Sequence, residues 1–523
     1  MNEYIEKARL FLKKEQLDYL LVNSTNEFLV EYNELKKNSR YFLTGFTGST
    51  GDALVSKNKV YLFVDGRYHI QADLEVNHDE VTVVKLELGK FIDELYGILE
   101  ENSTLGICSN KNSQYRYETL VEKFKEKKIK LKLIDNDPIA NKIINQKQDI
   151  TEIPFNLAGK TTNEKIKDIS KNLKDDEALI VTNLEDISYL YNIRNFNKEN
   201  SCSVEGKAII TKDSNILFKD ETLDDFNNYL KNTANIKTFY VKKADITAKD
   251  YALISDKAKK SEISIKKYLK TEAEIEHYKD AFKRTDNAIS ATREFIHNNN
   301  NISEYDIKVE LENNFKKFGA KCQSFTSIVA KDKNSALAHY SKSSKNEIVK
   351  EGSLVLIDCG GYYGGGLATD TTRVFVKGQP TDLHKKVYTT VLKAFLHAFN
   401  IKDFDCGFDI DYLARDFLKN NAPDGFLFNH GLGHGIGVSV HEAPPRLNAL
   451  SSEAFVEFED NMCFTIEPGL YRENYFGVRL ENSCYFKDGK INSFTNMCYE
   501  SKLIDISMLN NNEKKWLDKF EVK

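Results

Sequence analysis

The sequence predicts a chain of α/β domains followed by an α+β domain, and three observations support this fold class. The chain has 523 residues, which corresponds to about three domains of roughly 100–200 residues each. Helical patterns and short apolar runs alternate through the first half of the chain, as they do in α/β domains. From Gly352 onward, short β-like runs and glycine-rich turns dominate and indicate an α+β region.

The first domain is predicted to cover residues 1–150. Ile5, Ala8 and Leu12 recur at helical spacing close to the N-terminus and predict an amphipathic helix. Three apolar runs then predict strands, at 19–22, 53–55 and 60–64. A turn-prone segment at 45–51 separates the first of these strands from the other two.

The second domain is predicted to cover residues 151–265 and to be of the same α/β type. Apolar runs at 178–181 and 208–210 predict strands, and 187–190 reads as a short helix. The lysine-rich passage 257–270 is expected to be a linker.

The third domain is predicted to cover residues 266–523. Thr271 and Glu274 fit a capping box, which predicts that a long helix begins there. A second helix is predicted further on, because four apolar residues fall on one face: Val387, Val391, Phe395 and Phe399.

Composition and charge exclude several classes of protein. Lys and Arg total 74 and Asp and Glu total 79, so the net charge is −5. The chain therefore lacks the basic excess of a protein that binds nucleic acid through bulk charge. No apolar run approaches the roughly 18–20 residues that span a bilayer, and the charged N-terminus does not resemble a secretory signal. We expect a cytoplasmic protein whose eight scattered cysteines are free thiols.

Two segments of the third domain share a pattern of acidic residues that is typical of a catalytic or metal-binding site. Each is an apolar run that ends in Ile-acid-x-Gly, with Asp358 in the first and Glu467 in the second. Each is followed by a turn-rich stretch and a further strand that carries another acid, Asp370 or Glu481. Two such hairpins would bring four carboxylates into one cleft, where they would repel one another unless cations bound them.

Each acid also has an ordinary structural interpretation. Asp358 could start an Asx turn, and Glu467 could lie in a simple turn before Pro-Gly. Glu481 could form a surface network with Arg479 on the same strand. The coincidence of two apolar strands that both end on acids favours a metal site instead. Carboxylate-rich sites suit Mn, and a histidine ligand extends the choice to Co and Zn.

Three of the ten histidines fall within twelve positions, at His430, His434 and His441. The glycines beside His434 would let the backbone approach a cofactor closely. A neutral imidazole is a good metal ligand, and a nearby histidine can stabilise developing charge. The alternative is a glycine-rich loop with incidental histidines. His339 stands alone in its segment, and by itself it reads as a structural histidine.

Together these motifs resemble those of the Xaa-Pro aminopeptidases (aminopeptidase P), of the long, three-domain cytosolic type within the pita-bread metallopeptidase superfamily. The segments YFLTGFTGS at 41–49 and VDGRY at 64–68 extend the resemblance to the first domain, so that it covers essentially the whole chain. It implies two N-terminal creatinase-like (RNase H-like) α/β domains and a C-terminal pita-bread catalytic domain.

The resemblance also implies a set of metal ligands for two divalent ions, usually Mn. Asp370 and Glu481 would bridge both ions and Asp358 would hold one of them. His434 and Glu467 would hold the other. Asp358 and Asp370 lie twelve positions apart, one more than the commoner family spacing. A glycine run at 364–366 could absorb the extra residue; otherwise Asp370 would turn to the other face of the sheet.

Further residues match positions that the family places near its substrate. His339, His430 and His441 match histidines that line the substrate and transition-state site, which raises His339 from a structural to a functional candidate. Arg479 matches an arginine two residues before the last metal ligand. In the first domain, Glu31 and Arg67 match residues that the long subfamily places near its active site; a solvated Glu and a core-capping Arg are the alternative.

The reaction implied by the resemblance is hydrolysis of the bond between an N-terminal residue and a following proline, through attack of a hydroxide that bridges the two metals. Glu467 would shuttle the proton, and His441 would stabilise the oxyanion. His339 and His430 would line the pocket that selects proline.

Prolidase is the nearest alternative, and a methionine aminopeptidase, a creatinase or a metal-free binding protein of the same fold is less consistent with the sequence. The family is commonly dimeric, and we expect a homodimer.

Overall fold

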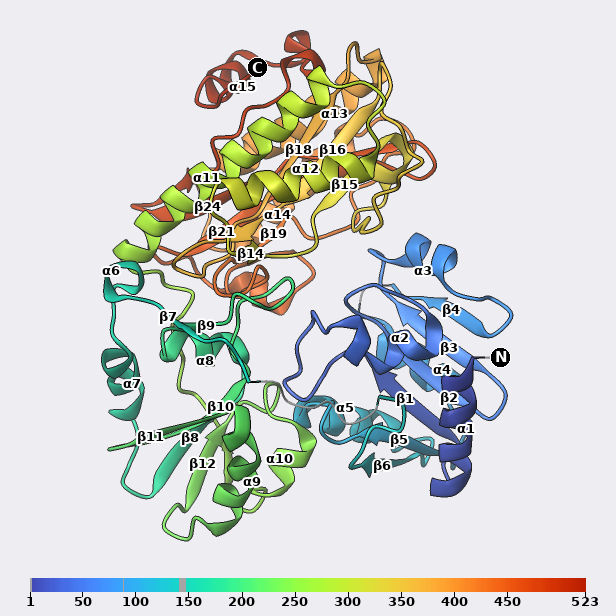
Figure 1. Cartoon of the computed structure of the whole chain (residues 1–523), viewed down its shortest axis with the longest axis vertical. Helices are drawn as coiled ribbons and strands as arrows, with labels where there is room; N and C mark the ends of the chain where they lie inside the picture. The colour runs from blue at the N-terminus through green and yellow to red at the C-terminus, as the bar shows by residue number, and fades with distance from the viewer. Residues whose placement is uncertain (1, 88, 141–146) are drawn as a thin grey trace. The chain divides into compact units, whose positions relative to one another are not determined.

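A six-stranded mixed sheet forms the core of the first N-terminal domain (Figure 1). Its strand order is β4-β3-β2-β1-β5-β6; β1, β2 and β3 run antiparallel, and β5 and β6 run parallel to β1. The strands are β1 (Tyr19–Asn23), β2 (Asp52–Ser56), β3 (Val60–Val64), β4 (Val81–Lys85), β5 (Thr104–Cys108) and β6 (Lys130–Ile134). The helices are α1 (Glu3–Glu15), α2 (Ser39–Thr44), α3 (His69–Glu75), α4 (Phe91–Ile98) and α5 (Gln114–Phe124). The predicted first helix and the three predicted strands are thus confirmed.

The second sheet has the same strand order and directions as the first, without a counterpart of β4. Its order is β11-β10-β8-β12-β13, with β8, β10 and β11 antiparallel and β12 and β13 parallel to β8. The strands are β8 (Glu177–Val181), β10 (Gly206–Thr211), β11 (Asn215–Lys219), β12 (Thr238–Val241) and β13 (Ala258–Lys260). The helices are α7 (Thr162–Ser170), α8 (Leu184–Leu190), α9 (Leu223–Asn232) and α10 (Ala248–Ala252). The predicted linker at 257–270 is wrong at its start, because β13 completes this sheet as an edge strand beside β12.

The structure is a computed structural model that describes residues 2–87, 89–140 and 147–523. The chain divides into two units, each with its own core. The first unit contains both N-terminal sheets and comprises residues 1–149, 162–191 and 204–265. The second comprises residues 150–161, 192–203 and 266–523, so two short segments from the N-terminal half belong to it. In the described residues, no helix is long and apolar enough to cross a membrane.

The second unit contains long helices and several short antiparallel sheets. Its helices are α6 (Phe155–Ala158), α11 (Glu272–Asn298), α12 (Glu304–Lys317), α13 (Asp382–Phe399), α14 (Gly407–Asn421) and α15 (Asn511–Leu517). Its first strands are β7 (Thr151–Glu152), β9 (Ile193–Arg194), β14 (Cys322–Gln323), β15 (Ile328–Lys331), β16 (Leu354–Cys359), β17 (Gly361–Tyr362) and β18 (Thr371–Val376). The later strands are β19 (Gly433–His434), β20 (Arg446–Leu447), β21 (Cys463–Ile466), β22 (Gly469–Arg472), β23 (Phe476–Arg479), β24 (Asn482–Lys487) and β25 (Lys490–Ser493). The predicted capping box of Thr271 and Glu274 is present at the start of α11.

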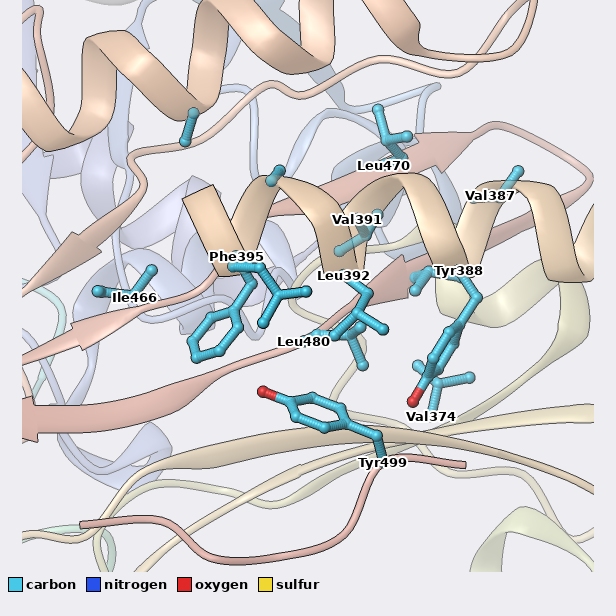
Figure 2. Packing of buried hydrophobic residues seen from close by; sticks show 14 of the residues in the cluster. Val374, Val387, Tyr388, Val391, Leu392, Phe395, Ile466, Leu470, Leu480 and Tyr499 are labelled. Atoms are coloured by element: carbon cyan, nitrogen blue, oxygen red, sulfur yellow. The ribbon is translucent and has the colours of Figure 1, made fainter. Parts of the chain in front are cut away.

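Helix α13 packs its apolar face into the core of the second unit. Val387, Val391 and Phe395 are fully buried, as predicted, and Phe399 is partly buried against the same cluster. Figure 2 shows Tyr388, Leu392 and Phe395 projecting from α13 toward the strands and toward Tyr499. Burying a large apolar side chain contributes about 1.5–3 kcal/mol. This core therefore supports the strands β16, β18 and β21, which carry or adjoin the predicted acids.

Candidate metal centre

The first acidic pair is carried by the antiparallel strands β16 and β18. Asp358 lies in β16 opposite Thr372 of β18, and Asp370 lies two residues before Thr372. Side chains alternate along a strand, so this register directs Asp358, Thr372 and Asp370 to the same face. The bridge between Tyr362 and Ala368 closes the turn, and the three glycines lie within it. The extra residue between the two acids is therefore accommodated in the turn and does not turn Asp370 away.

The second acidic pair flanks the antiparallel strands β21 and β24. Ile466 pairs with Asn482, so Glu467 follows one strand at the point where Glu481 precedes the other. Glu481 directly precedes β24, just as Asp370 directly precedes β18. The Thr372 hydroxyl donates to Glu481 Oε2 over 2.7 Å and joins the two pairs.

His434 lies between carboxylates of both pairs. Its Nε2 is 3.6 Å from Asp370 Oδ2 and 3.4 Å from Glu467 Oε1. Its Nδ1 lies 3.1 Å from the carbonyl of Gly435, which favours the tautomer that carries its proton on Nδ1. The Nε2 lone pair then faces the acids. Asp370, His434 and Glu481 each offer an atom within 4.8 Å of the others, a spacing suited to a metal ion.

Burial and mutual repulsion make this cluster unfavourable as four free anions. Burial, followed by the charge of Glu481, raises the pKa of Asp370 well above its usual range. The same two causes raise the pKa of Glu467. Burial and then Asp358 raise the pKa of Glu481 to about 8. Within the described residues, Asp358 Oδ1 and Glu481 Oε1 are buried without a hydrogen-bond donor. Divalent cations would satisfy these oxygens and remove the repulsion, so the residues present fit such ions.

A chain of hydrogen bonds leads from Asp358 to His430. Arg479 donates from Nη2 to Asp358 Oδ2 over 2.6 Å and from Nη1 to the Tyr471 hydroxyl over 2.7 Å. The same hydroxyl lies 2.8 Å from His430 Nε2. All of these groups come from different strands or loops of the second unit, so the chain holds Arg479 and His430 at fixed positions beside the acids.

The other two predicted histidines lie in loops of the same unit. The rings of His441 and His434 meet edge to face with centroids 4.4 Å apart. His339 follows a 3₁₀ helix, η3 (Asp332–Ala336), which docks on β23 through a bond from the Gly477 amide to the Ser335 hydroxyl. Strand β23 also carries Arg479, so the loop of His339 begins beside the hydrogen-bonded chain.

Glu31 and Arg67 belong to the first unit, where the structure brings them together. Arg67 Nη1 lies 3.7 Å from Glu31 Oε1, and the Ser49 hydroxyl donates to the same oxygen over 3.0 Å. Arg67 also forms two bonds with Asp65, from Nε and Nη2, each 2.9 Å long. The two predicted residues therefore form part of one half-exposed polar cluster.

Sequence reasoning missed Tyr471 and Thr372, which connect the predicted residues. Tyr471 pairs across strands with Gly477, and a Cβ at Gly477 or Gly469 would lie 2.5 Å from the tyrosine side chain. The two glycines thus make room for the ring. They were visible in the sequence, but their meaning depends on the β22–β23 register, which the sequence alone does not show.

Comparisons with known protein families find matches along most of the chain. Residues 276–488 match the model of metallopeptidase family M24, and residues 5–143 and 141–353 match models of the creatinase/prolidase N-terminal domain. In both halves the chain is thus similar to M24 metallopeptidases that carry creatinase-type N-terminal domains.

Individual relatives extend the match to nearly the full chain. The Xaa-Pro aminopeptidase 1 of Dictyostelium discoideum is 27% identical, over 99% of this chain and 92% of the relative. The crystal structure of X-prolyl aminopeptidase from Caenorhabditis elegans, described as a cytosolic enzyme with a di-nuclear active site, has a TM-score of 0.90 at 21% identity and covers 99% of this chain and 94% of that one. Aminopeptidase P from E. coli has a TM-score of 0.51 at 17% identity over 70% of this chain and 98% of that one. The predicted creatinase-type and pita-bread fold is confirmed.

Proposed function

We propose that this chain is a metal-dependent aminopeptidase that releases the N-terminal residue from peptides with proline at the second position. The observation that carries the proposal is the cluster of buried Asp370 and Glu481 with half-buried His434, and with Asp358 and Glu467 beside it, in the region that matches the M24 model. The relatives that match 99% of this chain are named for Xaa-Pro cleavage. An enzyme of this class needs the N-terminal amine of its substrate within reach of the metal centre.

The proposed cofactors are two divalent ions, Mn²⁺ in the first place, with Co²⁺ or Zn²⁺ as alternatives. Asp358, Asp370, His434, Glu467 and Glu481 would hold these ions. Four carboxylates and one imidazole suit Mn²⁺, a cation that prefers oxygen ligands. When bound, such ions lower the pKa of a water and polarise the scissile carbonyl.

The side chains of the protein would then perform the proton transfers and orient the substrate. Glu467 would accept a proton from the attacking water and deliver it to the proline nitrogen that leaves. His441, packed against His434, would donate to the developing oxyanion. His339 and His430 would line the pocket for proline, and Arg479 would hold Asp358 and the Tyr471 hydroxyl in place.

The proposal is tested by removing metals with a chelator and restoring Mn²⁺, Co²⁺ or Zn²⁺ separately. An Xaa-Pro-Xaa tripeptide, an Xaa-Pro dipeptide and an Xaa-Ala-Xaa tripeptide are then compared as substrates. We expect cleavage of the proline tripeptide, restored best by Mn²⁺. Cleavage restricted to the dipeptide would establish a prolidase, and no cleavage with any ion would indicate a binding protein without catalytic activity.

We propose further that two copies associate through an apolar patch of the second unit. The α14 patch comprises Phe408, Tyr412, Phe455 and Val456. Phe408 stacks on Phe455 with centroids 4.9 Å apart and on Tyr412 with centroids 5.9 Å apart, and Tyr412 and Phe455 are each 60% exposed. Clusters of exposed apolar side chains mark interaction surfaces. A cytoplasmic location, which we propose with the homodimer, agrees with the description of the Caenorhabditis elegans relative as a cytosolic enzyme.

The domain limits 1–150, 151–265 and 266–523 and the roles of Glu31 and Arg67 complete the proposal. Two separate sheets of like topology support a first boundary near residue 150.

The polar cluster of Glu31 and Arg67 would assist binding of the peptide substrate. Arg67→Met should then raise KM and leave kcat unchanged in the tripeptide assay; an unchanged KM would remove both residues from the site.

A further inference from the structure

A buried carboxylate outside the metal cluster holds the loop of His430 and His434. Asp411, on α14, is completely buried. Its Oδ1 accepts from the Leu432 amide over 3.0 Å and its Oδ2 accepts from the Ala449 amide over 2.9 Å. Arg415, one turn further along α14, donates to both oxygens, from Nη2 over 2.8 Å and from Nε over 3.0 Å. The carboxylate therefore binds two backbone segments at once.

Arg415 extends this contact to the peptide group of His430. Its Nη2 also donates to the His430 carbonyl over 2.8 Å, and its guanidinium lies 4.5 Å from the centre of the Phe428 ring. The carbonyl of His430 and the amide of Leu432 are thus both bound by the Asp411–Arg415 pair. These groups flank Gly431, which has no side chain to restrict its backbone. The bonds from Arg415 to the His430 carbonyl and from the Leu432 amide to Asp411 restrict the backbone on both sides of this glycine.

The same pair aligns the strand of His434. Strand β19 pairs with β20, with His434 opposite Arg446 and Gly433 opposite Leu447. Asp411 binds Leu432, which immediately precedes β19, and Ala449, two residues after β20. One carboxylate thereby ties together the open ends of this two-stranded ladder. Bonds of this kind, with one charged partner, are stronger than neutral ones.

We propose that Asp411 and Arg415 are positioning residues for this site: the pair sets the backbone of His430 and of His434 and does not touch the metals or the substrate. The inference rests on the proposed function for His430, whereas its consequence for His434 concerns metal binding and can be measured without substrate. Partners that orient metal ligands typically contribute about 10–100-fold to metal affinity or activity.

The test compares matched substitutions on α14 in the full chain. Arg415→Met removes the guanidinium and keeps an extended apolar side chain, and Lys419→Met makes a comparable change at an exposed position of the same helix. Asp411→Asn is matched in the same way by Asp416→Asn. Each protein is titrated with Mn²⁺ by calorimetry after metal removal, its Co²⁺ form is recorded by visible absorption, and kcat and KM are measured with the tripeptide.

We expect Arg415→Met and Asp411→Asn to weaken Mn²⁺ binding and lower kcat, each about 10–100-fold, with a smaller change in KM and an altered Co²⁺ spectrum. The two matched controls should behave as the wild type. A folded Arg415→Met with wild-type Mn²⁺ affinity and Co²⁺ spectrum would overturn the proposal. An unfolded Arg415→Met would overturn it too, because the pair would then serve the stability of the domain. If the wild type cleaves no tripeptide, the proposed function fails, and the Mn²⁺ titration still decides the role of the pair.

Discussion

At the residue scale, the site is defined by carboxylates that are buried too closely to ionise together without cations. Asp370 and Glu481 are 5% and 2% exposed. Two buried guanidinium groups lie near the acids: Arg479 donates to the Asp358 carboxylate, and Arg373 donates to the backbone carbonyl of Glu481. Two guanidinium groups do not neutralise four carboxylates, so the remaining negative charge is what would bind divalent metal.

Glu467 should be needed for turnover more than for folding. Its Oε1 accepts a long hydrogen bond of 3.4 Å from the Thr465 hydroxyl and lies 3.4 Å from His434 Nε2. Glu467→Gln, measured with the tripeptide and saturating Mn²⁺, should lose at least about 100-fold in kcat because a carboxamide accepts no proton. Glu473→Gln, at an exposed position of the β22–β23 turn, is the control. Full turnover by Glu467→Gln would assign the proton transfer to another group.

The metal-free protein should become less stable as the pH rises. Its folded state holds a proton on Glu481 up to a pKa of about 8, while the ordinary value is 4.5. Between these values the folded state binds more protons than the unfolded state, so the free energy of unfolding falls with increasing pH. Denaturation in the presence of chelator should therefore show lower stability at pH 8 than at pH 6, with a weaker dependence in Glu481→Gln. Equal pH dependence in the two proteins would contradict the raised pKa.

At the element scale, the hairpin that carries Asp370 depends on close packing of glycine against a helix. A Cβ at Gly365 would lie 2.5–2.9 Å from the His277 ring of α11, whereas a Cβ at Gly364 would meet Leu157 at an ordinary 3.6 Å. His277 is buried, and burial lowers its pKa to about 4, so the ring packs there as a neutral group.

Gly365→Ala should therefore destabilise the hairpin by about 1–3 kcal/mol, since one of the two elements has to shift. Gly364→Ala is the matched control and should be tolerated. In a His277→Ala background the cost of Gly365→Ala should shrink, because the clashing ring is absent. Chemical denaturation of the wild type and the four variants measures these differences; equal costs of Gly365→Ala in both backgrounds would rule out the ring contact.

The elements also show what could be predicted from the sequence. Strands such as β16 and β21 were predictable because an apolar run ends on an acid, and α11 was predictable from its capping box. Strand β13 was missed because two of its three residues are lysines on an edge strand, where exposed charge is normal. Tyr471 and Asp411 were missed because their partners lie on other elements. Such contacts depend on register and packing, which local patterns do not encode.

At the scale of the whole molecule, the second unit carries both the five predicted metal ligands and the α14 patch. Tyr412 of that patch is the direct neighbour of Asp411 in sequence, and it is 60% exposed.

Phe455→Ser should weaken the proposed homodimer at least tenfold, as measured by sedimentation equilibrium, because it removes a stacked aromatic side chain from the patch. Leu10→Ser, at a 70% exposed position of α1, is the control. A wild type that is monomeric at micromolar concentration would contradict the dimer.

The central feature of the proposed enzyme is a set of five side chains that would hold a pair of cations. The most direct measurement is anomalous diffraction from crystals of the full chain grown with Mn²⁺. We predict two peaks, enclosed by Asp358, Asp370, His434, Glu467 and Glu481. Peaks located elsewhere, or none at saturating Mn²⁺, would contradict the metal centre and with it the proposed peptidase.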